Sequence, residues 1–173
     1  RDVGKITPHL NRRVTNMILN ATDSGARVVM CTCSSIGPCV EVARPLTSCP
    51  VLRVDVPMAR EAVSAGGAVV VAATLKSTLV PTTSIVLSAA RQVEKTVEVT
   101  ELLCETAWAE MEKGNTEGYF AAIAEDLRKS AEGAQAIVLA QASMAQAVKL
   151  CPDISIPILT SPKSGFLEAL DQY

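Results

Sequence analysis

The run Thr32-Cys33-Ser34-Ser35 has the residue types of a site that binds and deprotonates a small acid. It follows a β-branched run and precedes a helical pattern, so we expect Cys33 at a helix N-terminus. There the helix dipole favours a thiolate, which can act as a base or a nucleophile. The hydroxyls of Ser34 and Ser35 can donate hydrogen bonds to a carboxylate. We therefore predict Cys33 as a catalytic residue with two substrate-binding neighbours.

Three more loops with small hydroxyl or amide side chains follow predicted strands. In open parallel sheets, ligands bind outside the carboxyl ends of the strands, where helix N-termini carry free backbone N–H groups. Ser and Thr are also common helix N-caps, so capping is the alternative for each residue taken singly. The recurrence at four strand ends favours a shared anion site. Its predicted residues in these loops are Thr74, Thr78, Gln141, Ser143, Thr160 and Ser161.

Two positions beside this site have alternatives of their own. Asp55 follows a predicted strand that ends at Val54, and it either lines the same cleft or caps the helix before Pro57. Cys31 precedes Cys33 by two residues and is predicted to be a small buried side chain. His9 is the only histidine, and no Ser-His-Asp or Cys-His arrangement can be assembled around it.

The cysteines raise the question of a metal site. Cys31, Cys33, Cys39 and Cys49 could supply four thiolates, but their spacing is not that of two CxxC knuckles. We predict no metal. An Ala- and Val-rich chain of this size fits reduced thiols and a cytoplasmic protein better than a disulfide scaffold. The cysteines interpreted as structural are Cys49, Cys104 and Cys151.

Composition excludes several classes of partner. The chain has 173 residues, of which 49% are hydrophobic, and this supplies a sizeable core. Its 16 basic and 18 acidic residues are spread along the chain, with no basic block to follow a phosphate backbone. Apolar runs such as 68–73 are far shorter than the roughly 20 residues that span a bilayer. We expect neither nucleic acid nor membrane as a partner.

Short β-branched runs alternate with longer segments of helical period along the chain. That alternation is typical of βα units and a parallel sheet, so the predicted fold class is α/β. One apolar helix face runs from Leu10 to Ala21, and a second runs from Tyr119 to Leu127. The predicted strands are 27–32, 51–54, 68–73, 96–102, 136–140 and 156–159.

An internal repeat organises these elements. The segment 25–35 aligns with 133–143 at an offset of 108 residues, and Pro50-Val51-Leu52 aligns with Pro157-Ile158-Leu159 at 107. We therefore predict two pseudo-symmetric lobes, each a parallel sheet flanked by helices, with the site in the cleft between them. The first lobe comprises 1–66 plus 161–173, and the second comprises 67–160.

The repeat also implies a further segment. The strand after Gly67 opens the second half about 66 residues before Gly133, so its counterpart would fall about 41 residues before Arg1. We expect a strand and helix ahead of the first lobe. The mass of the native protein tests this expectation, and a native chain that starts at Arg1 would contradict it.

The runs 29–37 and 137–145 resemble the aspartate/glutamate/hydantoin racemase superfamily. The likeness extends to 4–8, 74–78 and 157–162. It implies two lobes that present one cysteine each to opposite sides of a substrate's α-carbon, with no cofactor. One thiolate removes the α-proton and the opposite thiol returns one, while hydrogen bonds hold the substrate carboxylate.

By this resemblance Cys33 matches the first cysteine, Ser34 and Ser35 match carboxylate donors, and Thr78 and Ser143 are their counterparts in the other lobe. Gln141 stands where the second cysteine belongs, and an amide neither takes nor delivers a proton at neutral pH. The family also includes decarboxylases and cis-trans isomerases with a changed set of cysteines.

The leading hypothesis is therefore a cofactor-independent isomerase that acts on a small carboxylate through Cys33, with homodimers as the base-rate assembly. Two alternatives stay open. One is a non-catalytic protein that binds a small anion, and the other is a decarboxylase or hydrolase with a single cysteine.

Overall fold

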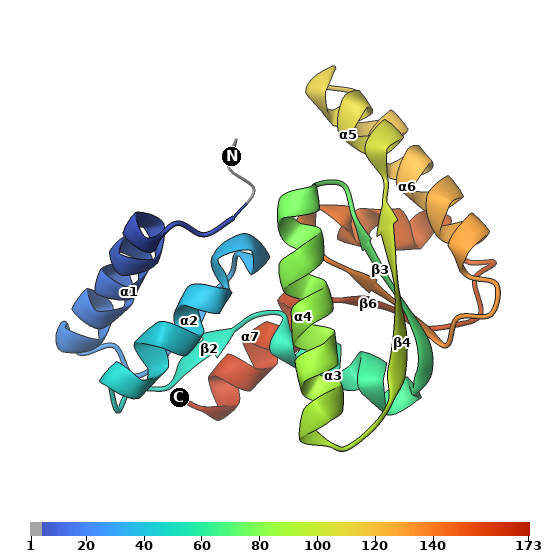
Figure 1. Ribbon diagram of the computed structural model, residues 1–173. Helices are drawn as coiled ribbons and strands as arrows, with labels where there is room; N and C mark the ends of the chain where they lie inside the picture. The colour runs from blue at the N-terminus through green and yellow to red at the C-terminus, as the bar shows by residue number, and fades with distance from the viewer. Residues whose placement is uncertain (1–4) are drawn as a thin grey trace.

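The computed structural model describes residues 5–173. Residues 1–4, which the sequence assigns to the first lobe and which include Gly4 of the motif 4–8, lie outside the described residues. Figure 1 shows two sheets side by side, joined by the chain after β2. The structure is thus α/β with two parallel sheets flanked by helices, and the predicted fold class is confirmed.

The smaller sheet pairs β1 (Val29–Cys31) with β2 (Val51–Arg53), and all three pairs of neighbours along the larger sheet are also parallel. The larger sheet has the order β4-β3-β5-β6, with β5 between β3 and β6. The six predicted strands are all present, with ends that differ by no more than two residues. The bounds of the larger sheet's strands are β3 Gly67–Ala73, β4 Val97–Leu103, β5 Ala136–Leu139 and β6 Ile158–Thr160.

Helices α1 (Pro8–Asp23) and α2 (Pro38–Ala43) cover the smaller sheet. Helix α1 begins where the sequence predicts, because Thr7 accepts a hydrogen bond from the backbone N–H of Leu10 and Pro8 occupies the first turn. Gly25 follows its end with a φ of 91°. The buried faces of both helices meet Val51 of β2 in a small core. Two 3-10 turns, η1 (Ser34–Ile36) and η2 (Arg44–Leu46), flank α2.

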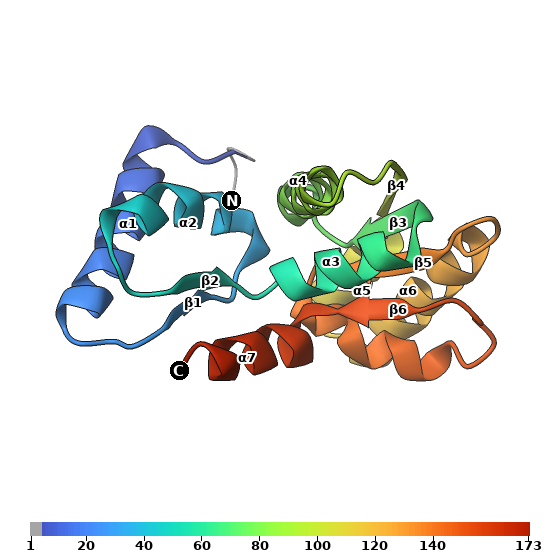
Figure 2. The same ribbon diagram turned by 90° about the horizontal axis from the view of Figure 1, so that it is seen from below.

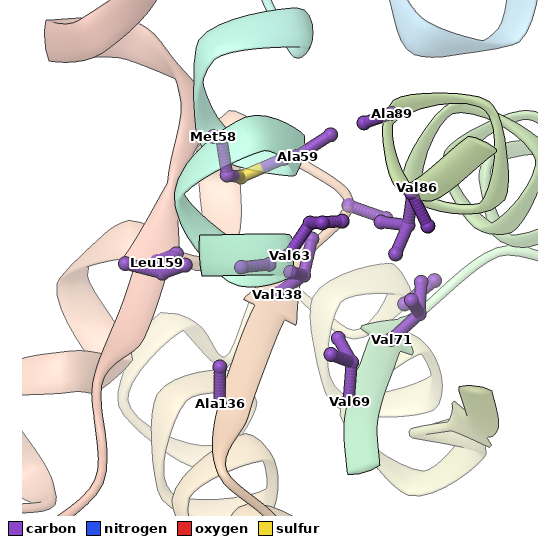
Figure 3. Close-up of a cluster of buried hydrophobic side chains, with 14 of the residues drawn as sticks. Met58, Ala59, Val63, Val69, Val71, Val86, Ala89, Ala136, Val138 and Leu159 are labelled. Atoms are coloured by element: carbon purple, nitrogen blue, oxygen red, sulfur yellow. The ribbon is translucent and has the colours of Figure 1, made fainter. Parts of the chain in front are cut away.

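Helices cover both faces of the larger sheet. On one face lie α3 (Val56–Ala65) and α4 (Lys76–Gln92), whose side chains interdigitate with Val69, Val71 and Val138 (Figure 3). The other face is covered by α5 (Glu105–Glu112), α6 (Thr116–Ser130) and the 3-10 helix η3 (Ala142–Leu150). Within residues 5–173, no helix is long and apolar enough to cross a membrane.

The helices that follow β2 and β6 link the two sheets. Helix α3 leaves the smaller sheet but buries its apolar side in the core of the larger one. Helix α7 (Ser161–Asp171) leaves the larger sheet and runs beneath β1 and β2, as Figure 2 shows. Its Gly165 lies against the backbone of Val54, and Arg27 stacks on the ring of Tyr173 at 3.9 Å. The lobe boundaries at residues 66 and 160 stay a prediction.

Candidate functional site

The chain leaves β1 at Cys31 and turns directly after Cys33. Cys33 is extended, at φ −119° and ψ 112°, and its carbonyl accepts a hydrogen bond of 3.3 Å from the backbone N–H of Ile36. Its side chain is exposed. The helix expected here is instead the single 3-10 turn η1, and α2 begins only at Pro38. A long helix dipole therefore does not act on Cys33. The exposure of Cys33 and its place after β1 are the features that still support its predicted role.

Ser34 connects the smaller sheet to the larger one. Its side chain is buried, and its hydroxyl donates a hydrogen bond of 3.2 Å to the carbonyl oxygen of Ala140, the residue that follows β5. The turn η1 also packs against α4. A serine has one proton to donate, and in this structure Ser34 donates it to Ala140; its role toward a substrate carboxylate stays a prediction. Its position brings Cys33 close to Gln141, the next residue after Ala140.

Gln141 anchors the loop that follows β3. Its Oε1 accepts hydrogen bonds from the backbone N–H of Thr74 at 2.7 Å and from the Thr74 hydroxyl at 3.1 Å. The Thr78 hydroxyl lies 3.3 Å from the same oxygen and donates to the carbonyl of Leu75 at 2.8 Å. Because a backbone N–H can only donate, the oxygen must face Thr74. The Nε2 group, with no protein hydrogen-bond partner among residues 5–173, offers two donors.

The remaining predicted residues lie around this cluster of Ser34, Thr74, Thr78 and Gln141. Ser35 is half-buried in η1, and exposed Ser143 pairs its hydroxyl with that of buried Tyr119 at 3.0 Å. Thr160 ends β6, which neighbours β5, and buried Ser161 follows it, so both share the sheet edge of Gln141. In the described part of the chain, these four residues make no hydrogen bond to the cluster.

Asp55 does not cap α3, and its predicted place in the cleft stays a prediction. It makes no side-chain capping bond to α3, although it occupies the N-cap position. Its carboxylate instead pairs with Arg53, through Nε to Oδ1 at 2.9 Å and Nη2 to Oδ2 at 2.8 Å. Both side chains are buried, and each carboxylate oxygen accepts one hydrogen bond from the guanidinium. Sequence reasoning missed Arg53, although it shares the buried face of Val51 at strand spacing.

Burial raises the pKa of four other cysteines, whose thiols are therefore protonated at neutral pH. Burial raises the pKa of Cys31, and the charges of Cys33 and Asp55 raise it further, while Arg53 opposes them. Burial, followed by the charge of Asp126, raises the pKa of Cys104 to about 12. Cys104 and Cys151 are buried, as expected for structural cysteines. Half-buried Cys49 donates its thiol hydrogen to the carbonyl of Ala26 at 3.1 Å.

Two cavities lie away from this cluster. One of about 600 Å³ lies between α2, β2, α3 and α4 and includes Arg53 and Arg60, and a second of about 490 Å³ lies beside Arg27 and Tyr173. Neither is lined by Cys33 or Gln141. We base the candidate site on exposed Cys33 and Gln141, whose neighbours Ser34 and Ala140 are hydrogen-bonded, because reactive groups decide chemistry and cavity size does not.

Comparison with known proteins shows the family to which this chain belongs. The family described as Asp/Glu/Hydantoin racemase matches residues 5–169. No curated protein matches the chain. Among solved structures, a glutamate racemase from Bacillus anthracis is similar with a TM-score of 0.73 and 16% identity, over 98% of this chain and 66% of that one.

Two further solved structures share the fold. A glutamate racemase from Francisella tularensis in complex with D-glutamate has a TM-score of 0.66 and 16% identity, over 97% of this chain and 66% of that one. An unliganded arylmalonate decarboxylase has a TM-score of 0.60 and 14% identity, over 95% of this chain and 76% of that one. The chain thus spans about two thirds of the length of both glutamate racemases.

Proposed function

Because the chain belongs to the Asp/Glu/Hydantoin racemase family, we propose that it is an enzyme that transfers a proton at the α-carbon of a small carboxylate, with Cys33 as the base. The observation that carries this proposal is the hydrogen bond between Ser34 and Ala140, which brings the exposed Cys33 turn to the strand end that holds Gln141. A substrate between the two would have a thiol on one side and an amide on the other.

The residues suggest a division of work. The Cys33 thiolate removes the α-proton, and the electron pair moves into the substrate carboxylate to give an enediolate. Within residues 5–173 neither the Nε2 of Gln141 nor the hydroxyl of Ser35 makes a hydrogen bond, so they are the groups that would stabilise its oxygens. The exposed Cys33 thiol exchanges its proton with water and then delivers a solvent proton to the same face of the α-carbon. This cycle replaces the α-proton by one from solvent without requiring a second cysteine.

Gln141 favours decarboxylation as a second candidate function. Loss of CO₂ breaks a carbon–carbon bond and leaves its electron pair on the α-carbon as an enediolate, so only one acid is needed to protonate the product. The Cys33 thiol would be that acid, and Gln141 would hold the retained carboxylate. The similarity to an arylmalonate decarboxylase supports the fold for this reaction and nothing more specific.

Solvent-deuterium exchange distinguishes these possibilities. The purified protein is incubated in D₂O with D- and L-glutamate, D- and L-aspartate, allantoin and phenylmalonate, and the α-position is followed by NMR. We expect deuterium at the α-carbon of one substrate, and its loss in a folded Cys33→Ala variant. Release of CO₂ would identify the decarboxylase instead.

Two results would contradict the proposal. Full exchange by Cys33→Ala would eliminate Cys33 as the base. Binding of one of these carboxylates by calorimetry, with neither exchange nor CO₂ release, would identify a non-catalytic anion-binding protein. Circular dichroism of the variant establishes that any loss arises from chemistry and not from unfolding.

A further inference from the structure

A buried ion pair lies directly behind the Cys33 turn. Arg53 is 5% exposed and Asp55 is 1% exposed, and two parallel N–H to oxygen bonds of 2.9 and 2.8 Å join them as a planar fork. Arg53 is the last residue of β2, and its neighbour β1 leads into Cys33. The backbone N–H of Val54 also donates to the carbonyl of Cys31 at 3.0 Å. The pair is therefore fixed to the same strand end as the thiol.

Gly37 reveals how closely the guanidinium approaches the turn. A Cβ at residue 37 would lie 2.6 Å from Cζ, 2.7 Å from Nε and 2.8 Å from Nη2 of Arg53. The φ of Gly37 is −48°, which any residue can adopt, so the glycine is needed for space. Its backbone N–H donates to the carbonyl of Ser34 at 3.1 Å and closes η1. The guanidinium thus packs on the backbone of the turn itself.

Stability alone gives a poor account of this pair. Taking two charges out of water is costly, and well-packed apolar side chains of similar volume often replace a buried pair without loss. Arg53 shares the buried face of β2 with Val51, where an apolar residue would be usual. Its charge and that of Asp55 also reach the sulfur of Cys31, where they change the thiol pKa in opposite directions. The Arg53 side chain is held rigidly against the turn, which favours a role in fixing the backbone geometry of that turn.

We propose that Arg53, held in place by Asp55, is a positioning residue that fixes the turn from Cys33 to Gly37 so that the Cys33 thiol faces the substrate. This inference rests on the proposed function of Cys33. Arg53 itself touches no reacting atom. It sets the backbone that carries Cys33 and, through Ser34, the contact with Ala140.

The test replaces both charges together, because removal of one would leave the other buried and unpaired. In Arg53→Met/Asp55→Leu we expect a urea midpoint close to that of the original protein, and a fall in the α-exchange rate of roughly 10- to 100-fold, mainly in kcat. The pH profile of Cys33 alkylation, followed by peptide mass spectrometry, should also change. The matched control is Arg60→Met/Glu168→Leu, which removes a 2.8 Å ion pair between α3 and α7 with an exposed arginine.

The outcomes of these experiments distinguish the positioning role of Arg53 from the proposed function of Cys33. A folded double variant with unchanged exchange rate and alkylation profile overturns the positioning role. If that variant fails to fold, Gly37→Ala provides the second test, because the added Cβ forces the turn and the Arg53 guanidinium apart. Unchanged exchange in Gly37→Ala then overturns the proposal. If α-exchange survives in Cys33→Ala, the proposed function of Cys33 is wrong. If α-exchange is lost in Cys33→Ala but the double variant is fully active, only the positioning role of Arg53 is wrong.

Discussion

The hydroxyl of Ser34 donates a 3.2 Å hydrogen bond to the carbonyl oxygen of Ala140, across 106 residues of sequence. The bond joins the turn after β1 to the end of β5, the two segments that the internal repeat pairs with each other. Cys33 and Gln141 are the immediate neighbours of its two ends. The geometry of any reaction between them therefore depends on this contact.

Replacement of Ser34 by Ala tests that dependence. The variant removes the only hydroxyl proton in the contact, and we expect a loss of about 1 kcal/mol in the free energy of unfolding. The rate of α-exchange should fall by about tenfold as the two loops separate. Urea denaturation and NMR exchange measure the two effects. Ser155→Ala removes an exposed serine from a loop and is the control; an equal effect in both variants would contradict the bridging role.

Gln141→Cys introduces an acid opposite Cys33. A thiol can deliver a proton to the second face of the intermediate, which an amide cannot do. We expect deuterium exchange to become coupled to inversion, so that one enantiomer converts to the other on a chiral column. Gln141→Ser is the matched control, because it also loses the bonds to Thr74 but has no acidic group. Equal inversion by both variants would show that residue 141 does not face Cys33 across the substrate.

The fold was predictable because its signals are local. Alternation of apolar strands with helical periods marks each βα unit, and the repeat supplies their pairing. Cys33 and Gln141 were found in the same way, since each follows a strand at a repeat-related position. The structure places them at neighbouring loops joined through Ser34 and Ala140.

Other features depend on atoms that residue type does not reveal. The acceptor of the Ser34 proton is a backbone carbonyl, which every residue has, so nothing in the sequence distinguishes Ser34 from Ser35. Strand spacing does not indicate the ion pair of Arg53 and Asp55, because β2 ends at Arg53 and Asp55 lies beyond it at the start of α3. For Asp55 the sequence left a cleft residue and a helix cap as equal alternatives, since an acidic residue before Val56-Pro57 has the usual pattern of a helix start.

Differential alkylation tests the assignment of the exposed cysteine. Cys33 is exposed, whereas Cys39, Cys104 and Cys151 are buried and have thiol pKa values raised by burial. Iodoacetamide at pH 8 should therefore modify Cys33 well before these three, because only the thiolate reacts and it must be reachable. Peptide mass spectrometry over a time course measures the order. Prior labelling of a buried cysteine in the folded protein would contradict the burial described here.

Cys104 should make the protein less stable in alkaline solution. Below about pH 8.5, its thiol is protonated in both the folded and the unfolded chain, so it has no effect on the pH dependence. At higher pH the unfolded thiol ionises, but burial and the charge of Asp126 keep the folded thiol protonated up to a pKa of about 12. The unfolded state then binds fewer protons, and the free energy of unfolding falls as pH rises, by at most about 1.4 kcal/mol per pH unit for this group.

Urea denaturation between pH 7.5 and pH 10.5 measures this fall, and Cys104→Ala should reduce its slope. Val70→Ala removes a buried group from the same apolar cluster without removing a titrating one, so it should lower stability equally at both pH values. The comparison is needed because other thiols with a raised pKa, such as that of Cys31, add to the total slope. Parallel slopes for the original protein and Cys104→Ala would mean that the thiol ionises equally readily in both states. That result would place Cys104 in contact with water and not in the core beside α6.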